Sequence, residues 1–406
     1  MATRFLPKIC QYSLASLGLL ILSGGVPAPL HAAEFTWTGE SEAGNGWTDS
    51  DNWSPGTGHP GADDTAHVDF SSTSGNVSVS NGSVGILNVG YGDLKNFSFG
   101  GGGSQSLTLQ MTSGSARINK GGSRDVTFIR RVNFASDTVI TVEGGRLIFE
   151  RDGGNAVFQG NGNITFEGAG GVSVFAGNST VFSTTFNGNT VVQNHGTLLI
   201  NSTFHASTAA PAASLSVADT GTLGGSGTVA RATTIGAGGI LSPGDGTAGV
   251  STSIQTYTGG LTLEAGASFH FGLTGNTTTG RGTMFDGIDI TAGLLSISSG
   301  AQFHLRLDQG GVDFTDAFWA DDRQWLVFDN ATAPLVEGAI FQIGSISPDS
   351  LGNDFSLTGG SFSFAQVDND IYLVYSAIPE PSGTLLLLGT GAAVTFLARR
   401  RFAGKA

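Results

Sequence analysis

The sequence predicts an all-β protein whose short strands stack as a parallel solenoid. From residue 77 to residue 217 the chain consists of apolar runs of about three to five residues, without helix-length apolar periodicity. Turn glycines recur at Gly145, Gly154, Gly162, Gly171, Gly177, Gly188 and Gly196. Phenylalanines keep nearly the same spacing, at Phe149, Phe158, Phe166, Phe175 and Phe186. Because strands this short cannot bury an apolar side alone, each must stack on its neighbours and place like side chains above one another.

The composition agrees with a folded, strand-rich chain. The chain contains 64 Gly and 11 Pro, which disfavour long helices, and 27 Phe, which give more apolar mass than a disordered linker carries. Cys10 is the only cysteine, so the chain after the N-terminal segment forms no disulfide. Residues 34–378 carry 31 acidic and 12 basic residues, a net charge near −19. This charge repels nucleic acid and anionic membranes, and we expect no nucleic-acid partner.

Residues 1–33 have the parts of a secretory signal peptide. Arg4 and Lys8 supply positive charge, and residues 14–22 (LASLGLLIL) form an apolar segment too short to span a membrane stably. Cleavage is expected after Ala32 or Ala33, although Leu30 departs from the small-x-small pattern, so that an uncleaved anchor stays an alternative. In both cases the following chain is expected outside the cytoplasm.

Residues 34–76 are expected to form a turn-rich cap over the N-terminal end of the solenoid. Trp37, Trp47 and Trp53 lie there among glycines and prolines, ahead of the repeats. Large rigid rings are one way to cover the open end of a solenoid core. The alternative is that the three rings form an aromatic platform that contacts sugars, but their place at the start of the chain favours the cap.

The β-helix is expected over residues 77–309, with its clearest repeats in residues 155–307. A GTLGGSGTV turn at 221–229 is followed by LSPG at 241–244, TLEAGASFHF at 262–271 and DGIDI at 286–290. This order resembles the autotransporter-associated β-strand repeat family. The resemblance implies a right-handed parallel β-helix. No outer-membrane barrel is expected after these repeats, so a self-translocating autotransporter is not predicted.

Residues 310–376 are expected to close the far end of the solenoid as a β-rich cap. Aromatic and acidic residues concentrate there, and strands lengthen, as at 324–328 (QWLVF). Alternating runs at 361–365 and 371–375, joined by residues 367–370, predict a hairpin.

The C-terminal residues 377–406 contain three marked parts followed by the chain end. The first is the triplet Pro379, Glu380 and Pro381. Residues 382–398 are uncharged and would span roughly 25 Å as a helix, close to a bilayer core of about 30 Å. The basic cluster is Arg399, Arg400 and Arg401. Cationic residues after an apolar span hold that end on the cytoplasmic side.

This order of parts resembles the PEP-CTERM sorting signal of Gram-negative bacteria. The resemblance implies recognition by an exosortase, a membrane-embedded sorting protease, with processing near the Pro-Glu-Pro triplet. It also implies transient contact with the inner membrane through a C-terminal transmembrane sorting helix, and delivery to the cell surface or an exopolysaccharide matrix. An ordinary membrane anchor is the alternative.

We expect no catalytic residue and no bound cofactor. The histidines lack metalloprotease spacing, and no G-x-S-x-G nucleophile elbow occurs. Asp286 and Asp289 are the nearest candidates for the paired carboxylates of a polysaccharide hydrolase. The cluster closest to a lyase site is Arg124, Asp125, Arg130 and Arg131. Repeat turns and solvated faces explain both sets better.

Calcium is a weaker expectation, because several acidic groups offer oxygen ligands. These groups are Asp49 with Asp51 and Asn52, Asp63 with Asp64, and Asp368 with Asp370. None follows an EF-hand or a nonapeptide calcium repeat, and such groups arise by chance in an acidic chain.

The sequence therefore predicts an exported, non-catalytic protein of the cell surface or extracellular matrix, sorted by an exosortase. It would act as an adhesin or as a scaffold with exopolysaccharide, and its partners would be exopolysaccharide or cell-surface glycans. The alternatives are a β-helical polysaccharide lyase or hydrolase, and a sugar-binding module centred on Trp37, Trp47 and Trp53.

Overall fold

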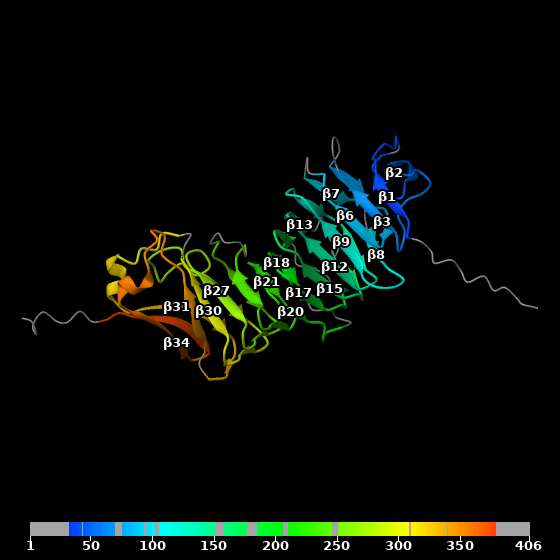
Figure 1. Cartoon of the computed structure of the whole chain (residues 1–406). Helices are drawn as coiled ribbons and strands as arrows, with labels where there is room; N and C mark the ends of the chain where they lie inside the picture. Colours follow the sequence, from blue (N-terminus) through cyan, green and yellow to red (C-terminus); the bar gives the residue numbers. More distant parts are fainter. Residues whose placement is uncertain are drawn as a thin grey trace, which may run out of the picture. The chain divides into compact units, whose positions relative to one another are not determined.

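The strands stack as long parallel sheets in the manner of a β-helix (Figure 1). The computed structural model describes residues 32–42, 44–69, 75–92, 96–101, 105–150, 158–176, 185–205, 210–245, 251–307, 310–338 and 340–378. Within these residues the strands form four hydrogen-bonded sheets, called A, B, C and D here. The paired strands are parallel except at the two ends, where β1–β2, β31–β35 and β34–β35 are antiparallel.

Sheets A and B form two sides of the stack. In spatial order, sheet A contains β2 (Trp53–Ser54), β1 (Glu34–Trp37), β3 (Thr65–Val68), β6 (Ile86–Val89), β9 (Ala116–Lys120), β12 (Thr138–Val142), β15 (Ile164–Glu167), β17 (Thr190–Val192), β20 (Leu215–Val217), β23 (Thr233–Ile235), β26 (Leu261–Leu263), β29 (Leu295–Ile297) and β32 (Leu335–Val336). Sheet B contains β33 (Gln342–Ile346), β30 (Gln302–Arg306), β27 (Ser268–Gly272), β24 (Ile240–Pro243), β21 (Thr222–Gly225), β18 (Thr197–Ile200), β16 (Gly171–Ala176), β13 (Gly145–Glu150), β10 (Val126–Phe128), β7 (Phe97–Gly100) and β4 (Asn76–Ser78).

Sheets C and D form the third side, one after the other along the stack. Sheet C contains β14 (Phe158–Gly160), β11 (Arg131–Phe134), β8 (Ser106–Leu109) and β5 (Ser83–Val84). Sheet D contains β19 (Thr203–Phe204), β22 (Thr228–Val229), β25 (Ile254–Tyr257), β28 (Gly287–Ile290), β31 (Arg323–Asn330), β35 (Asp370–Ser376) and β34 (Ser361–Val367). The 3₁₀ turns are η1 (Ser50–Asn52), η2 (Ala317–Ala320) and η3 (Phe355–Thr358).

A typical coil of the chain contributes one strand to sheet A, one to sheet B and one to the third side. The coil β6, β7, β8 is followed by β9, β10, β11, and each strand pairs in parallel with its counterpart one coil later. In the part of the chain that the structure describes, the third side is interrupted between β14 and β19, and Phe186 there bridges back to Gly160. Sheets C and D meet at this interruption.

Alternation along the strands fills the core with apolar side chains. Successive residues of a strand point to opposite faces, and in β12 this places Ile140 and Val142 inside and Val139 and Thr141 outside. The five regularly spaced phenylalanines, Phe149, Phe158, Phe166, Phe175 and Phe186, are all buried. They lie on different sides of the stack, so their spacing of eight to eleven residues measures the step from one side to the next.

One row of phenylalanines runs through sheet B. Phe128 pairs with Phe99 and Phe149, and Phe149 pairs with Phe175. The ring centroids are 4.5 Å apart for Phe99 and Phe128, 5.4 Å for Phe128 and Phe149, and 6.0 Å for Phe149 and Phe175. Like side chains therefore lie above one another, as expected for stacked coils.

Polar side chains hold the corners between coils. Asn163 Oδ1 accepts from the backbone N–H of Asn189 at 2.9 Å, and Asn189 Oδ1 accepts from that of Ser214 at 3.0 Å. Asp137 Oδ1 likewise accepts from the backbone N–H of Asn163 at 2.8 Å. Buried Lys120 donates to the carbonyls of Gly122 and Gly144, both at 2.8 Å. These bonds satisfy backbone groups that the strands leave unpaired.

The C-terminal end combines parallel coils with the expected hairpin. Strands β34 and β35 pair from Ser361 with Ser376 to Val367 with Asp370. Parallel pairing continues beyond the expected range of 77–309, from β1 at one end to β33 at the other. In the part of the chain that the structure describes, no helix is long and apolar enough to cross a membrane.

Candidate functional site

Three tryptophans come together at the N-terminal end of sheet A. The Trp53 ring meets Trp37 and Trp47 edge to face, with centroids 5.0 and 4.8 Å apart. Trp47 also approaches Phe99 of the core at 6.4 Å. The exposed fractions are 5% for Trp37, 0% for Trp47 and 2% for Trp53. These rings cover the core and offer no free face to a sugar, so the exposed platform considered from the sequence does not agree with the structure.

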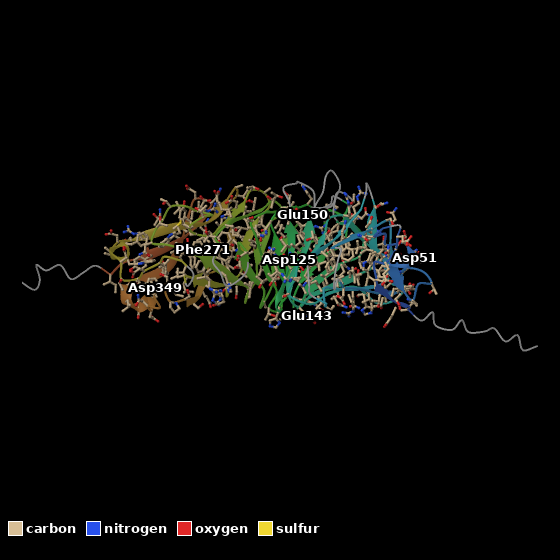
Figure 2. All side chains as sticks on the ribbon, turned by 90° about the horizontal axis from the view of Figure 1, so that it is seen from above. Asp51, Asp125, Glu143, Glu150, Phe271 and Asp349 are labelled. Atoms are coloured by element: carbon tan, nitrogen blue, oxygen red, sulfur yellow. The ribbon has the colours of Figure 1, made fainter. Side chains whose placement is uncertain are left out.

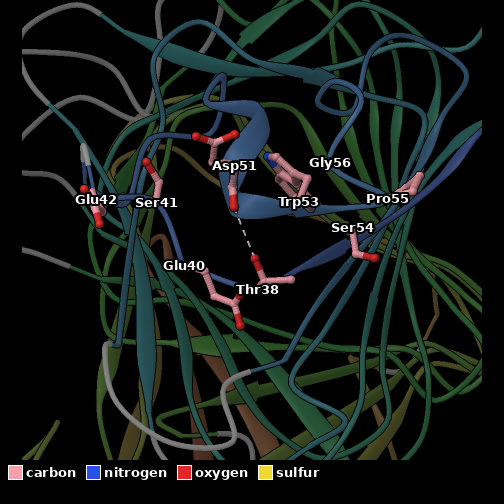
Figure 3. Close-up of a pocket in the computed structure, with 9 residues that line it drawn as sticks. All are labelled: Thr38, Glu40, Ser41, Glu42, Asp51, Trp53, Ser54, Pro55 and Gly56. Carbon is pink, nitrogen blue, oxygen red and sulfur yellow. Dashed lines mark hydrogen bonds between the residues drawn. The ribbon is translucent and has the colours of Figure 1, made fainter.

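An open pocket of about 820 Å³ lies beside this cluster (Figure 3). It is lined by hydroxyl and carboxylate side chains together with Trp53 and a turn; the lining residues are Thr38, Glu40, Ser41, Glu42, Asp51, Trp53, Ser54, Pro55 and Gly56. Thr38 Oγ1 donates to the Asp51 carbonyl oxygen at 3.4 Å across the pocket. The lining forms hydrogen bonds and carries negative charge, so it suits neutral hydroxylated or cationic ligands.

The carboxylates near this pocket also shape its walls. Asp49 accepts from the Asp51 N–H at 3.1 Å and from the Ser41 hydroxyl. Buried Asn52 donates to the carbonyls of Gly44 at 2.8 Å and Gly46 at 3.0 Å. Sequence reasoning missed the pocket because its walls come from the loop after β1, from η1, and from β2 with the turn that follows it, which only the fold brings together.

The other acidic groups considered for calcium are bonded to the backbone. Asp64 accepts from the N–H of Ala33 at 2.8 Å, and Asp370 accepts from that of Asn330 at 2.9 Å. The Thr112 hydroxyl and N–H both donate to Asp63 and lower its pKa. Asp368 lies in the hairpin turn with φ 54°. Among the described residues, no three or more His, Cys, Asp or Glu side chains are arranged to hold a metal ion.

Asp286 and Asp289 have separate structural partners. Asp286 is buried and accepts from the N–H groups of Gly272 at 2.7 Å and Ser253 at 2.9 Å. Burial raises the Asp286 pKa to about 8. Asp289 points outward and pairs with Arg281 at 2.6 Å. One carboxyl therefore joins loops inside the stack while the other forms a surface ion pair.

Within the cluster considered for a lyase, Asp125 is engaged between coils. Asp125 accepts from Arg146 Nη2 at 2.7 Å, and this hydrogen bond raises the Arg146 pKa. Arg131 begins β11, and Arg124 is exposed at the turn before β10. Figure 2 shows Asp51, Asp125, Glu143, Glu150 and Asp349 spread along the molecule, so these carboxylates do not converge on one centre.

The outer surfaces of sheets A and D carry rows of hydroxyl groups, one from each of three or four successive coils. In sheet A, Ser216, Thr234, Thr262 and Ser296 occupy matching positions on successive strands. In sheet D, Thr203, Thr228 and Thr256 do the same, and Asp289 follows them. All of these residues are partly exposed. The signal in the sequence is a hydroxyl residue between two apolar ones, as in 215–217, 261–263 and 295–297.

Comparison with protein families finds a match between residues 377–401 and the PEP-CTERM protein-sorting motif. A search of curated proteins finds no match. The family match confirms the motif expected from Pro379, Glu380, Pro381, Arg399, Arg400 and Arg401, all of which lie outside the described residues. A PEP-CTERM motif marks a protein that is exported, processed by an exosortase and sorted to the cell surface in Gram-negative bacteria.

Proposed function

We propose that this chain is a non-catalytic protein of the cell surface or extracellular matrix, where it serves as an adhesin or as a scaffold with exopolysaccharide. The observation that carries the proposal is a sorting motif at residues 377–401 attached to a β-helix with an apolar, filled interior. A filled interior leaves the long sides of the coils as the surfaces that meet a partner.

The hydroxyl rows favour neutral polysaccharide as that partner. Each hydroxyl both donates and accepts hydrogen bonds, and the rows repeat at the strand spacing of about 4.8 Å. Individual contacts of this kind are weak, and repetition along a polymer raises the overall affinity. The acidic excess of residues 34–378 works against anionic polysaccharides.

The sorting part is tested by determining the C-terminus of the secreted protein by mass spectrometry. In cells that contain an exosortase, the mature chain is expected to end near Pro379 and to lack Arg399, Arg400 and Arg401. Glu380→Ala is expected to reduce this processing, whereas Glu337→Ala, outside the motif, leaves it unchanged. A secreted form that retains all three arginines would contradict the proposal.

The surface part is tested by binding to the exopolysaccharide of the same cells. The double variant Thr234→Ala with Thr262→Ala removes two neighbouring hydroxyls from sheet A, and Thr203→Ala with Thr228→Ala removes two from sheet D. Weaker binding for one pair identifies the face in contact. If the wild-type protein binds neither neutral nor cationic polysaccharides, the proposal is wrong.

The open pocket favours a second candidate function, a sugar-binding or carbohydrate-active site. Glu40, Glu42 and Asp51 supply three carboxylates, and a glycoside hydrolase needs two. Incubation with acidic and neutral polysaccharides separates the possibilities. Product release that Glu40→Gln or Asp51→Asn abolishes would establish an enzyme, and binding without product would establish a sugar-binding module.

Three finer features complete the proposal. The coils wind in a right-handed sense, as the resemblance to autotransporter-associated repeats implies. Residues 382–398 form the transmembrane part of the sorting signal, and residues 1–33 form a cleaved signal peptide, of which residues 1–31 lie outside the described chain. The uncharged composition of residues 382–398 and the arginines after it support the transmembrane assignment.

A further inference from the structure

We propose that the C-terminal end of the β-helix lies against the membrane surface while the sorting tail is attached, and leaves it when the tail is cut. Leu351, Leu357 and Ile378 are the residues that contact lipid. This inference rests on the proposed membrane insertion of residues 382–398.

These three side chains are unusually exposed for apolar residues. Their exposed fractions are 68% for Leu351, 65% for Ile378 and 60% for Leu357, the highest of the large apolar residues that the structure describes. Leu357 lies in η3, and Ile378 lies over Gly359, which ends this turn. Figure 1 shows the orange segment that contains η3 at the same end of the stack as the point where the coloured chain ends.

The segment that presents them is firmly held. Asp349 accepts from the N–H groups of Leu351 at 2.9 Å and Phe314 at 2.8 Å, so the turn around Leu351 is fixed to the last coils. Phe355 of η3 packs on Phe362 and Phe314, with centroids 4.8 and 5.5 Å apart. The side chains of Leu351 and Leu357 thus stay exposed to solvent, because neighbouring residues pack against the core in their place.

The sorting tail brings this end to the membrane. The uncharged stretch begins at Ser382, four residues after Ile378. A fully extended chain gains at most about 3.6 Å per residue, so Ile378 stays within about 14 Å of the start of that stretch. A tether this short gives an effective concentration in the millimolar range, at which a weak contact is populated.

The charge of the same end opposes binding without the tether. Residues 310–378 contain ten acidic residues and one basic residue, Arg323. Such a surface is repelled by anionic lipid over a Debye length of about 8 Å at physiological ionic strength. Cleavage near Pro379 therefore removes the tether, and charge repulsion then favours release of the mature protein.

Fluorescence quenching in vesicles tests the contact. The full chain, carrying Cys10→Ser and L357C with a fluorophore on the introduced thiol, is reconstituted in phosphatidylcholine vesicles that contain a lipid-linked nitroxide quencher. The matched control is Y91C, since Tyr91 is 50% exposed on the coil of β6, far along the stack from η3. We expect several-fold stronger quenching for L357C than for Y91C. Replacing part of the lipid with phosphatidylglycerol is expected to reduce the quenching, and added salt to restore it.

Vesicle flotation distinguishes failure of the membrane insertion of the tail from failure of the surface contact. Protein that does not float with the vesicles would contradict membrane insertion of the tail, and hence this part of the proposed function. Protein that floats while L357C and Y91C are quenched equally would overturn the surface contact alone. Quenching that rises with phosphatidylglycerol would overturn the release by charge.

Discussion

Replacing Arg231 by Met should weaken the β-helix at the interruption of its third side. The Arg231 guanidinium donates to the carbonyl oxygens of Phe186 and Gly188, both at 2.6 Å, and to that of His205 at 3.1 Å. It lies between the rings of Phe186 and Phe204, 4.8 and 4.5 Å from their centroids. One side chain thus joins the coils on both sides of the point where sheet C ends and sheet D begins.

The expected loss of stability follows from these contacts. A hydrogen bond to a charged group contributes about 1.5–3 kcal/mol, so three bonds represent a gross loss of about 4.5–9 kcal/mol. Methionine regains apolar contact with the two rings and avoids the cost of burying a cation. Burial lowers the Arg231 pKa to about 10, because removal from water disfavours the charged form. We expect a net loss of about 3–5 kcal/mol, because three carbonyl oxygens each lose a partner at about 1–3 kcal/mol and the methionine contacts offset part of this loss.

Urea denaturation followed with two probes measures this loss. Far-UV circular dichroism reports the whole stack, whereas the five tryptophans of the chain lie at its ends, three at the N-terminal end and two in η2 and β31. Because coils contact only their neighbours, a weakened interface lets the two halves unfold separately. R231M should therefore lower the midpoint and split the transition, with the two probes no longer coinciding.

The matched control is R146M. Arg146 forms a surface ion pair with Asp125, and its side chain is 57% exposed, so the change should be at most about 1 kcal/mol. A single transition for R231M at the wild-type midpoint would refute the reasoning. Equal shifts for R231M and R146M would do so as well, because they would show that the buried carbonyl contacts give no net stability.

Three further predictions concern the core, a turn and a buried acid. Phe149→Ala should lower the free energy of unfolding by about 3–5 kcal/mol, since the ring is fully buried. The control Glu150→Ala, at an exposed position, should change the free energy of unfolding by less than about 0.5 kcal/mol. Similar urea midpoints for both variants would contradict a close-packed core. Gly225→Ala should lower the melting temperature, because Gly225 has φ 108° and an added Cβ would lie 2.2 Å from the Ile200 carbonyl oxygen; an unchanged melting temperature would count against this geometry. Asp286→Asn should gain stability relative to the wild type as the pH rises from 4 to 8, by at most about 1.4 kcal/mol per pH unit. The reason is that burial raises the Asp286 pKa from 3.8 to about 8, so the native state keeps a proton that the unfolded state loses. Urea titrations across this range check the slope, and a constant difference between the two proteins would refute it.

Much of the strand pattern could be read from local sequence. The alternating run at 138–142 forms β12, and the runs at 361–365 and 371–375 form the expected hairpin of β34 and β35. These predictions succeeded because alternation and turn residues act over a few neighbouring positions. The sorting motif was predictable for the same reason, since its parts are contiguous.

Which strands stack on one another was not readable in this way. Leu223 pairs with Leu241, 18 residues later, whereas Phe269 pairs with Phe303, 34 residues later. The strands keep their register while the turns between them differ in length. No fixed period therefore identifies the partner strands. The spacing between consecutive strands can be read from the sequence, whereas the number of residues in one complete coil varies and cannot.

The β class of this protein, its acidic charge and its sorting signal follow from the sequence alone, because each depends on composition or on contiguous residues. The three-dimensional fold was needed to show that Trp37, Trp47 and Trp53 cover the core, that a polar pocket lies beside them, and that Arg231 joins the two halves of the third side. Burial and partner choice depend on contacts between coils that are distant in the chain. The sequence alone does not show whether a tryptophan or an arginine side chain is exposed to water or buried in the core.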